Sequence, residues 1–98
     1  MTGIELIAKE RQEQIEKHGR TIEKDEKENT SCELSNVASF LAVNEHYRGC
    51  NDVDDIVDMM PEKWNKTICL KMMNKSYRER LIIAGALIAA EIDRLQLE

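Results

Sequence analysis

Carboxylates recur along the first segment of the chain at a spacing that could serve metal chemistry. Glu10, Glu13 and Glu16 stand three residues apart. On a helix, residues with this spacing lie on one side, so the three side chains could gather around a hard cation such as Mg²⁺. A solvated helix face has the same pattern. We predict the solvated face, with a carboxylate cluster as the alternative.

Arg11 belongs to the same segment but falls on a stripe of aliphatic residues with helical spacing. The stripe comprises Ile4, Ile7, Ala8 and Ile15. An isolated charge buried among such residues is costly, so the guanidinium must be paired or must face a cavity. We predict a structural ion pair with Glu33 or Glu91, and an arginine that faces a ligand is the alternative.

His18 and Arg20 flank Gly19, at the point where this helical pattern stops. An imidazole near the end of a helix interacts favourably with the helix dipole, which is the simpler role for His18. The alternative is that His18, Arg20 and the polar segment after them close over an anionic ligand, because a guanidinium offers the bidentate geometry that phosphate favours.

Three further groups of residues invite a chemical interpretation. Arg78 and Arg80 lie beside the start of the last predicted helix, where the positive end of the dipole could hold an anion. The acidic stretch from Asp52 to Asp58 lacks the glycine and the distal glutamate of a calcium loop, so we interpret it as solvated charge. Trp64 is interpreted as a core anchor, with a base-stacking platform as the alternative.

The elements that position these residues are predicted to be helices. Capping-box patterns, in which Ser or Thr and a Glu three residues later satisfy free amides of a first turn, start at Thr2, Thr30 and Ser76. Gly19 is typical of a left-handed stop, and Pro61 of a helix start. The predicted helices are one from the Thr2 box to Gly19, residues 31–47, a short helix within 49–61, residues 61–74 and residues 77–97, with a loop or lid at 20–31.

The last of these helices contains the stretch from Leu81 to Ala90, which has no polar side chain. Apolar surface therefore surrounds the helix, as in an element that is buried on every side. Small residues four apart, such as Gly85 and Ala89, let another backbone approach closely. We predict an all-α fold, a compact bundle of about four helices with a long buried C-terminal helix, and a homo-oligomer that forms through that helix.

Composition narrows the class of protein. Ninety-eight residues, of which 42% are apolar and 34% charged, are typical of a single globular domain over residues 1–98. The net charge is −5 and neither half of the chain is basic, which argues against general nucleic-acid binding. The apolar stretch is too short for a membrane span, and three cysteines without a C-x-x-C pair favour a reducing cytoplasm.

Both ends of the chain resemble a known set of proteins. The two segments are IELIAKERQEQIEKHG at residues 4–19 and RLIIAGALIAAEIDRL at residues 80–95. They resemble a family of small bacteriophage and prophage proteins whose pattern runs from ERQxQ, through HG or GW, a polar loop, a second helix and a Trp-containing segment, to AGALIxAEIxRL. The resemblance implies a phage-type protein in the cytoplasm of a bacterial host cell.

That family is in turn similar to the MazG-like all-α NTP pyrophosphohydrolases, which often begin with an E-x-x-x-Q-x-x-K-W-G type helix and hold Mg²⁺ through E-E-x-x-E and E-x-x-D motifs. The corresponding residues here are Glu10, Gln14, Lys17 and Gly19, with Glu91 as the late acidic residue. Neither metal motif is intact. Asn36 and Val37 occupy positions where further acids are expected, and Glu91 and Asp93 are two apart. The resemblance implies the fold more than the activity.

The sequence therefore predicts a protein that binds a nucleotide-class anion without efficient hydrolysis, for example to sequester a nucleotide signal of host defence. The expected ligand-binding residues are Glu10, Arg11, Gln14, His18, Arg20, Glu33, Arg78, Arg80 and Glu91. No cofactor or metal is expected. One alternative is an Mg²⁺-dependent pyrophosphohydrolase that recruits Glu10, Glu33 and Glu91, and another is a protein–protein inhibitor of a host factor.

Overall fold

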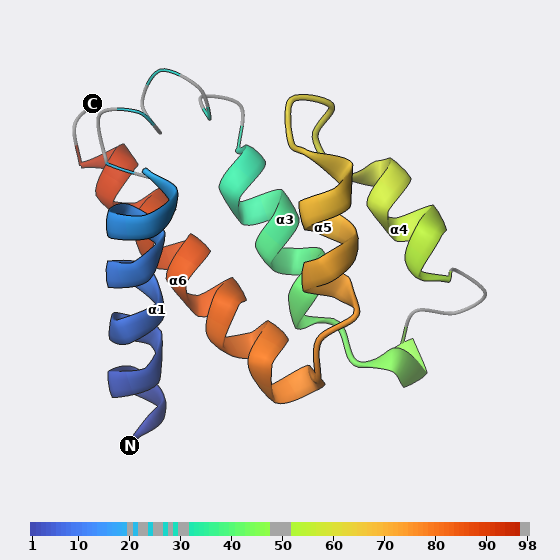
Figure 1. Cartoon of the computed structure of the whole chain (residues 1–98), viewed down its shortest axis with the longest axis horizontal. Coiled ribbons are helices and arrows are strands. Elements are labelled where there is room, and N and C mark those ends of the chain that lie inside the picture. Colours follow the sequence, from blue (N-terminus) through green and yellow to red (C-terminus); the bar gives the residue numbers. More distant parts are fainter. Residues whose placement is uncertain are drawn as a thin grey trace.

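The computed structural model describes residues 1–19, 32–47 and 52–96, together with Thr21, Lys24, Lys27 and Asn29. Its helices are α1 (Gly3–His18), α3 (Glu33–Ala42), α4 (Val53–Met59), α5 (Lys66–Met73) and α6 (Tyr77–Leu95), and a 3₁₀ helix, η1, spans Glu45–Tyr47 (Figure 1). This part of the chain contains no strand and measures 38 × 33 × 22 Å. The predicted all-α class is confirmed for these residues.

The ends of the first and last helices follow their local sequence as predicted. The Thr2 hydroxyl accepts a hydrogen bond from the Glu5 amide, and the Thr2 amide donates to the Glu5 carboxylate, which completes the capping box. Hydrogen bonding to the Thr2 backbone amide, and secondarily to the Thr2 side chain, holds the pKa of the Glu5 carboxyl below its usual range. Gly19 ends α1 with a φ of 65°, and Ser76 caps α6.

The predicted helix at 31–47 is divided into two pieces. α3 begins at Glu33 after Cys32, which has a left-handed φ of 67°, and the predicted cap Thr30 lies outside the described residues. The helix ends at Ala42 because Val43 adopts an extended conformation, and η1 follows. Two carbonyls at this end are bonded by Arg80 from α6, so a distant side chain satisfies the helix terminus.

The predicted helix start at Pro61 is wrong. α5 begins at Lys66, and the side chain of Asn65 caps it by accepting a hydrogen bond from the Ile68 amide. The short helix predicted within 49–61 is present as α4. The Lys66 ammonium donates to the carbonyls of Met60 and Pro61 at 2.8 and 3.2 Å and so ties the end of α4 to the start of α5.

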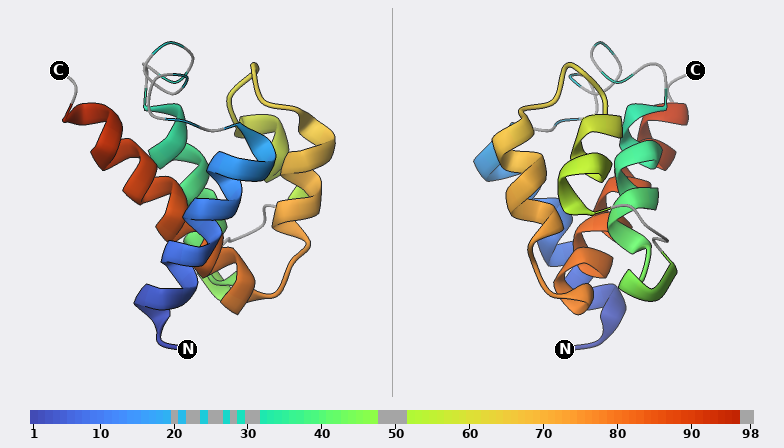
Figure 2. Two further views of the ribbon diagram at one scale, coloured as in Figure 1. Left: turned by 60° about the vertical axis from the view of Figure 1, so that its left-hand side comes forward. Right: turned by 90° about the vertical axis from the view of Figure 1, so that its right-hand side faces the viewer.

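α6 is the element on which the fold is assembled. α3 and α1 pack on two different sides of it, and α4 packs on α5 (Figures 1 and 2). The core includes fully buried residues of α3, namely Leu34, Val37 and Leu41, together with Leu87 and Ala90 of α6. Burial of these aliphatic side chains supplies the main stabilisation of the helices, which are short on their own.

Small residues on α6 allow α1 to approach closely, as the sequence predicted. A Cβ atom built on Gly85 would lie 2.6 Å from Cδ1 of Ile7, a distance that real Cβ atoms essentially never show. The neighbour at this point is therefore a helix of the same chain. The contact fixes the position of α1 relative to α6.

Two predictions about burial are wrong for a single chain. α6 is not covered on every side, because Leu81, Ile88, Ile92 and Leu95 expose between 40% and 52% of their surface. On α1, Ile4 is 82% exposed, whereas the buried residues are Arg11 and Gln14. α1 meets α6 through Ile7, so the predicted aliphatic stripe is turned partly toward solvent.

Of the described helices, none is both long and apolar enough to cross a membrane.

Candidate functional site

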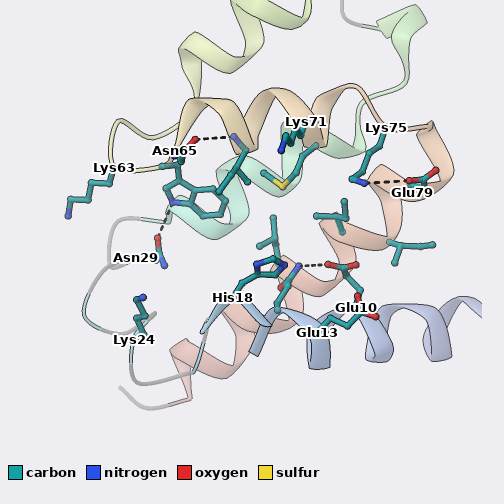
Figure 3. A pocket seen from close by; sticks show the side chains of 17 residues that line it. Glu10, Glu13, His18, Lys24, Asn29, Lys63, Asn65, Lys71, Lys75 and Glu79 are labelled. Atoms are coloured by element: carbon teal, nitrogen blue, oxygen red, sulfur yellow. Dashed lines mark hydrogen bonds and ion pairs between the residues drawn. The ribbon is translucent and has the colours of Figure 1, made fainter. Parts of the chain in front are cut away.

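A cleft of about 1020 Å³ lies between α1 and α5, with residues of α6 between them (Figure 3). The lining residues of α1 are Glu10, Glu13, Gln14 and His18. Those of α5 and its flanks are Lys63, Trp64, Asn65, Ile68, Lys71, Met72 and Lys75, and those of α6 are Glu79, Ile82, Ile83 and Leu87. Lys24 and Asn29 also line the cleft. The cleft therefore combines an apolar interior with two polar walls from different helices.

Trp64 joins the cleft to the hydrophobic core. It is 8% exposed, belongs to the core cluster and also lines the cleft, so its interpretation as a core anchor is confirmed. Its indole N–H donates to Oδ1 of Asn29 at 3.2 Å, which satisfies the polar edge of the buried ring. The bond attaches Asn29, a residue of the predicted 20–31 loop, to the wall of the cleft.

The α1 wall of the cleft carries hydrogen-bond acceptors. The Gln14 amide nitrogen donates to Oε2 of Glu10 at 3.2 Å. Gln14 is only 4% exposed, and its Oε1 has no hydrogen-bond partner among the described residues. Glu13 lies on the same wall, whereas Glu16 accepts a hydrogen bond from Gln12 on the exposed side of the helix. The predicted series of three carboxylates is thus divided between the cleft and solvent.

The opposite wall carries ammonium groups. Lys63, Lys71 and Lys75 come from α5 and the residues beside it (Figure 3). Lys75 pairs with Glu79 at 3.8 Å, and Lys63 and Lys71 have no ion pair with any residue that the structure describes. Each exposed lysine is a weak partner alone, but several beside a low-dielectric apolar wall raise the local concentration of anions.

Arg80, a predicted ligand-binding residue, lies outside the cleft. Its guanidinium is fully buried and donates to the carbonyls of Leu41 and Val43 at 3.1 and 2.9 Å. It is also ion-paired with Glu45, and it lies 5.4 Å from the centre of the Tyr77 ring. These contacts join α6 to the end of α3. Arg78 is exposed and does not line the cleft.

A second polar group lies toward the end of α6, again away from the cleft. Arg11 pairs with Asp93 at 3.7 Å, a partner that the sequence did not suggest. Glu91, a predicted partner of Arg11, accepts a hydrogen bond of 2.5 Å from Arg94, and both residues are buried. Glu33 is also buried, at the start of α3. None of these residues lines the cleft.

The predicted ligand-binding residues are therefore separated by the fold. Glu10, Gln14 and His18 come together in the cleft, and Arg20 lies outside the described residues. In the part of the chain that the structure describes, no three His, Cys, Asp or Glu side chains gather closely enough to hold one metal ion, so Glu10, Glu33 and Glu91 do not form a shared site. In the acidic stretch from Asp52 to Asp58, the carboxylate of Asp52 accepts a hydrogen bond from the Asp55 amide and so caps α4.

Sequence reasoning missed the lysines of the cleft. Lys71 and Lys75 are four residues apart beside the apolar face formed by Ile68 and Met72, and this spacing was the available signal.

No protein-family model, curated protein or solved structure matches the chain. The arrangement itself is suited to bind a ligand that has an apolar planar part and a negatively charged part.

Proposed function

We propose that this protein binds a nucleotide-class anion in the cleft between α1 and α5. The observation that carries the proposal is the position of three lysines next to an apolar interior. A nucleotide combines a flat heterocycle, which gains from leaving water, with phosphates that need cationic partners. The cleft volume of about 1020 Å³ slightly exceeds the roughly 300–1,000 Å³ range of small-molecule sites, so a nucleotide fits.

Each part of the cleft has a role in this proposal. Met72, Ile83 and Leu87 provide the apolar surface for the base, and Trp64 provides an aromatic one. Lys63, Lys71 and Lys75 bind the phosphates. Binding without efficient hydrolysis is the form of the proposal that the chemistry supports, since Glu33 and Glu91 lie outside the cleft. A protein of this kind would act by sequestering its nucleotide, as in the neutralisation of a signal of host defence.

Isothermal titration with ATP, GTP, CTP and UTP tests the proposal. We expect the native chain to bind at least one of them, and the double variant Lys71→Ala/Lys75→Ala to bind it about tenfold more weakly or worse, because two phosphate partners are lost. Lys9→Ala is the matched control, since Lys9 is exposed on α1 and does not line the cleft. Absence of binding to all four nucleotides refutes the proposal.

The same samples address turnover. Incubation of each nucleotide with the native chain and Mg²⁺ or Mn²⁺ should release no pyrophosphate above the rate of a protein-free blank. Release that depends on Glu10 or Glu13, the carboxylates on the α1 wall, would replace binding with pyrophosphohydrolysis as the function.

We further propose that the chain forms a homo-oligomer through α6. Leu81, Ile88, Ile92 and Leu95 are half exposed and follow each other at intervals of seven, four and three residues, so they form one apolar stripe. A second copy presents the same stripe, and two such stripes can cover each other about a two-fold axis. Ile88→Glu should reduce the mass in sedimentation analysis to that of a monomer, whereas Met59→Glu, at an exposed residue of α4, should not.

A further inference from the structure

We infer that Gln14 recognises an N–H donor on the base of the bound nucleotide, while the phosphates lie against the lysines of the opposite wall. The inference rests on the proposed function and adds to it the orientation of the ligand and the basis of its selectivity. Gln14 is more than nine-tenths buried, lines the cleft and has an acceptor atom without a partner among the described residues.

Glu10 fixes which end of the Gln14 amide is left without a partner. A carboxylate can only accept hydrogen bonds, so the group that approaches Glu10 must be the amide nitrogen, and it does so at 3.2 Å. Oε1 of Gln14 is consequently the amide atom that has no hydrogen-bond partner among the described residues. A buried carbonyl oxygen without a donor is unfavourable, and a ligand N–H would remove this cost.

The charges of the two walls favour one orientation of the ligand. A phosphate placed at the α1 wall would meet the carboxylates of Glu10 and Glu13, and like charges at short distance repel. At the α5 wall it meets Lys63 and Lys71, which can only donate. The phosphates therefore lie along α5, and the hydrogen-bonding edge of the base is directed to α1.

This arrangement defines the ligand by its chemistry. The base must present an N–H group, which Gln14 accepts, next to a ring that the apolar residues of the cleft can cover. Every natural base presents at least one such donor. Purine riboside 5′-triphosphate does not, although it has the shape and the phosphates of ATP. A site built to bond an N–H group rejects an analogue without it, because the acceptor is again left without a partner.

The test compares natural nucleotides with purine riboside 5′-triphosphate by isothermal titration. The native chain should bind its best natural nucleotide at least tenfold more tightly than purine riboside 5′-triphosphate. Gln14→Met keeps the length of the side chain and removes its hydrogen-bonding groups. In this variant the affinity for the natural nucleotide should fall to that for purine riboside 5′-triphosphate, which itself should be unchanged. Gln12→Met, on the exposed side of α1, should behave as the native chain.

The outcomes separate the inference from the proposed function. Equal affinity of the native chain for both kinds of nucleotide contradicts the role of Gln14 but leaves nucleotide binding in place, as does a preference that persists in Gln14→Met. Binding of no nucleotide contradicts both. The comparison of two ligands on the native chain needs no variant, so a loss of folding in Gln14→Met cannot obscure the result.

Discussion

The surroundings of Arg80 and the cleft around Gln14 both hold polar groups away from water, but they differ in what lies beside those groups. Each has one buried polar atom without a hydrogen-bond partner among the described residues, Nε of Arg80 and Oε1 of Gln14. The Arg80 guanidinium bonds two carbonyls and a carboxylate and lies close to the Tyr77 ring. In the cleft, acceptors on α1 face ammonium groups on α5 across an open volume of about 1020 Å³. The first arrangement joins α6 to the end of α3, whereas the second encloses an open cleft, which is where we propose that a ligand binds.

Removal of the Arg80 charge should have the largest effect on stability. Arg80→Met leaves the carbonyls of Leu41 and Val43 without their donor in a buried setting, so we expect the free energy of unfolding to fall by about 3 kcal/mol. Urea denaturation followed by circular dichroism measures this. Arg78→Met is the control, since Arg78 is exposed, and it should change stability by no more than about 0.5 kcal/mol. Equal effects of the two substitutions would show that Arg80 does not join the helices.

Displacement of α1 should affect the cleft and spare the Arg80 region. Gly85→Val places side-chain atoms where Ile7 now lies, and we expect a loss of about 2 kcal/mol in stability together with weaker nucleotide binding. Addition of Ile7→Ala should restore part of both losses because it vacates the same space. A double-mutant cycle in urea measures the coupling, and purely additive effects would contradict the contact.

The lysines of the cleft should have the smallest effect on stability. Lys71→Ala/Lys75→Ala removes one exposed ion pair, with Glu79, so the free energy of unfolding should change by no more than about 0.5 kcal/mol. Nucleotide binding should nevertheless be reduced, as proposed above. A large loss of stability in this variant would place the lysines among the structural residues and remove the contrast with Arg80.

The parts of the fold that were predictable are those determined by neighbouring residues. The caps at Thr2 and Ser76 and the stop at Gly19 involve residues within a few positions of each other, so their patterns are visible in the sequence. The end of α3 depends on Arg80, which is nearly forty residues away. The sequence offers both Pro61 and Asn65 as starts for α5, and the helix begins after Asn65, whose side chain caps it. Neither follows from helical periodicity.

The candidate site was predictable only in part, for the same reason. Glu10 and Gln14 came from the resemblance of the first segment to known proteins, and His18 from its position at a predicted helix end. The structure places all three together in the cleft. Arg11 was predicted to pair with Glu33 or Glu91, with a ligand as the alternative, and Arg80 was expected to bind a ligand, because a sequence does not show Asp93 or a distant carbonyl beside them. Conversely, no role was predicted for Lys71 and Lys75, since only the fold brings α1 opposite them.

Trp64 provides the most direct measurement of whether the cleft binds a nucleotide. It is the single tryptophan of the chain, it lines the cleft, and its indole N–H gives one isolated resonance in a ¹H–¹⁵N correlation spectrum. Titration with the nucleotide that binds best should shift this resonance and the amides of Gln14 and Lys71, while the amides of Leu41 and Val43 near Arg80 stay in place. A Trp64 resonance that does not move at saturating nucleotide, or shifts confined to the Arg80 region, would contradict the account.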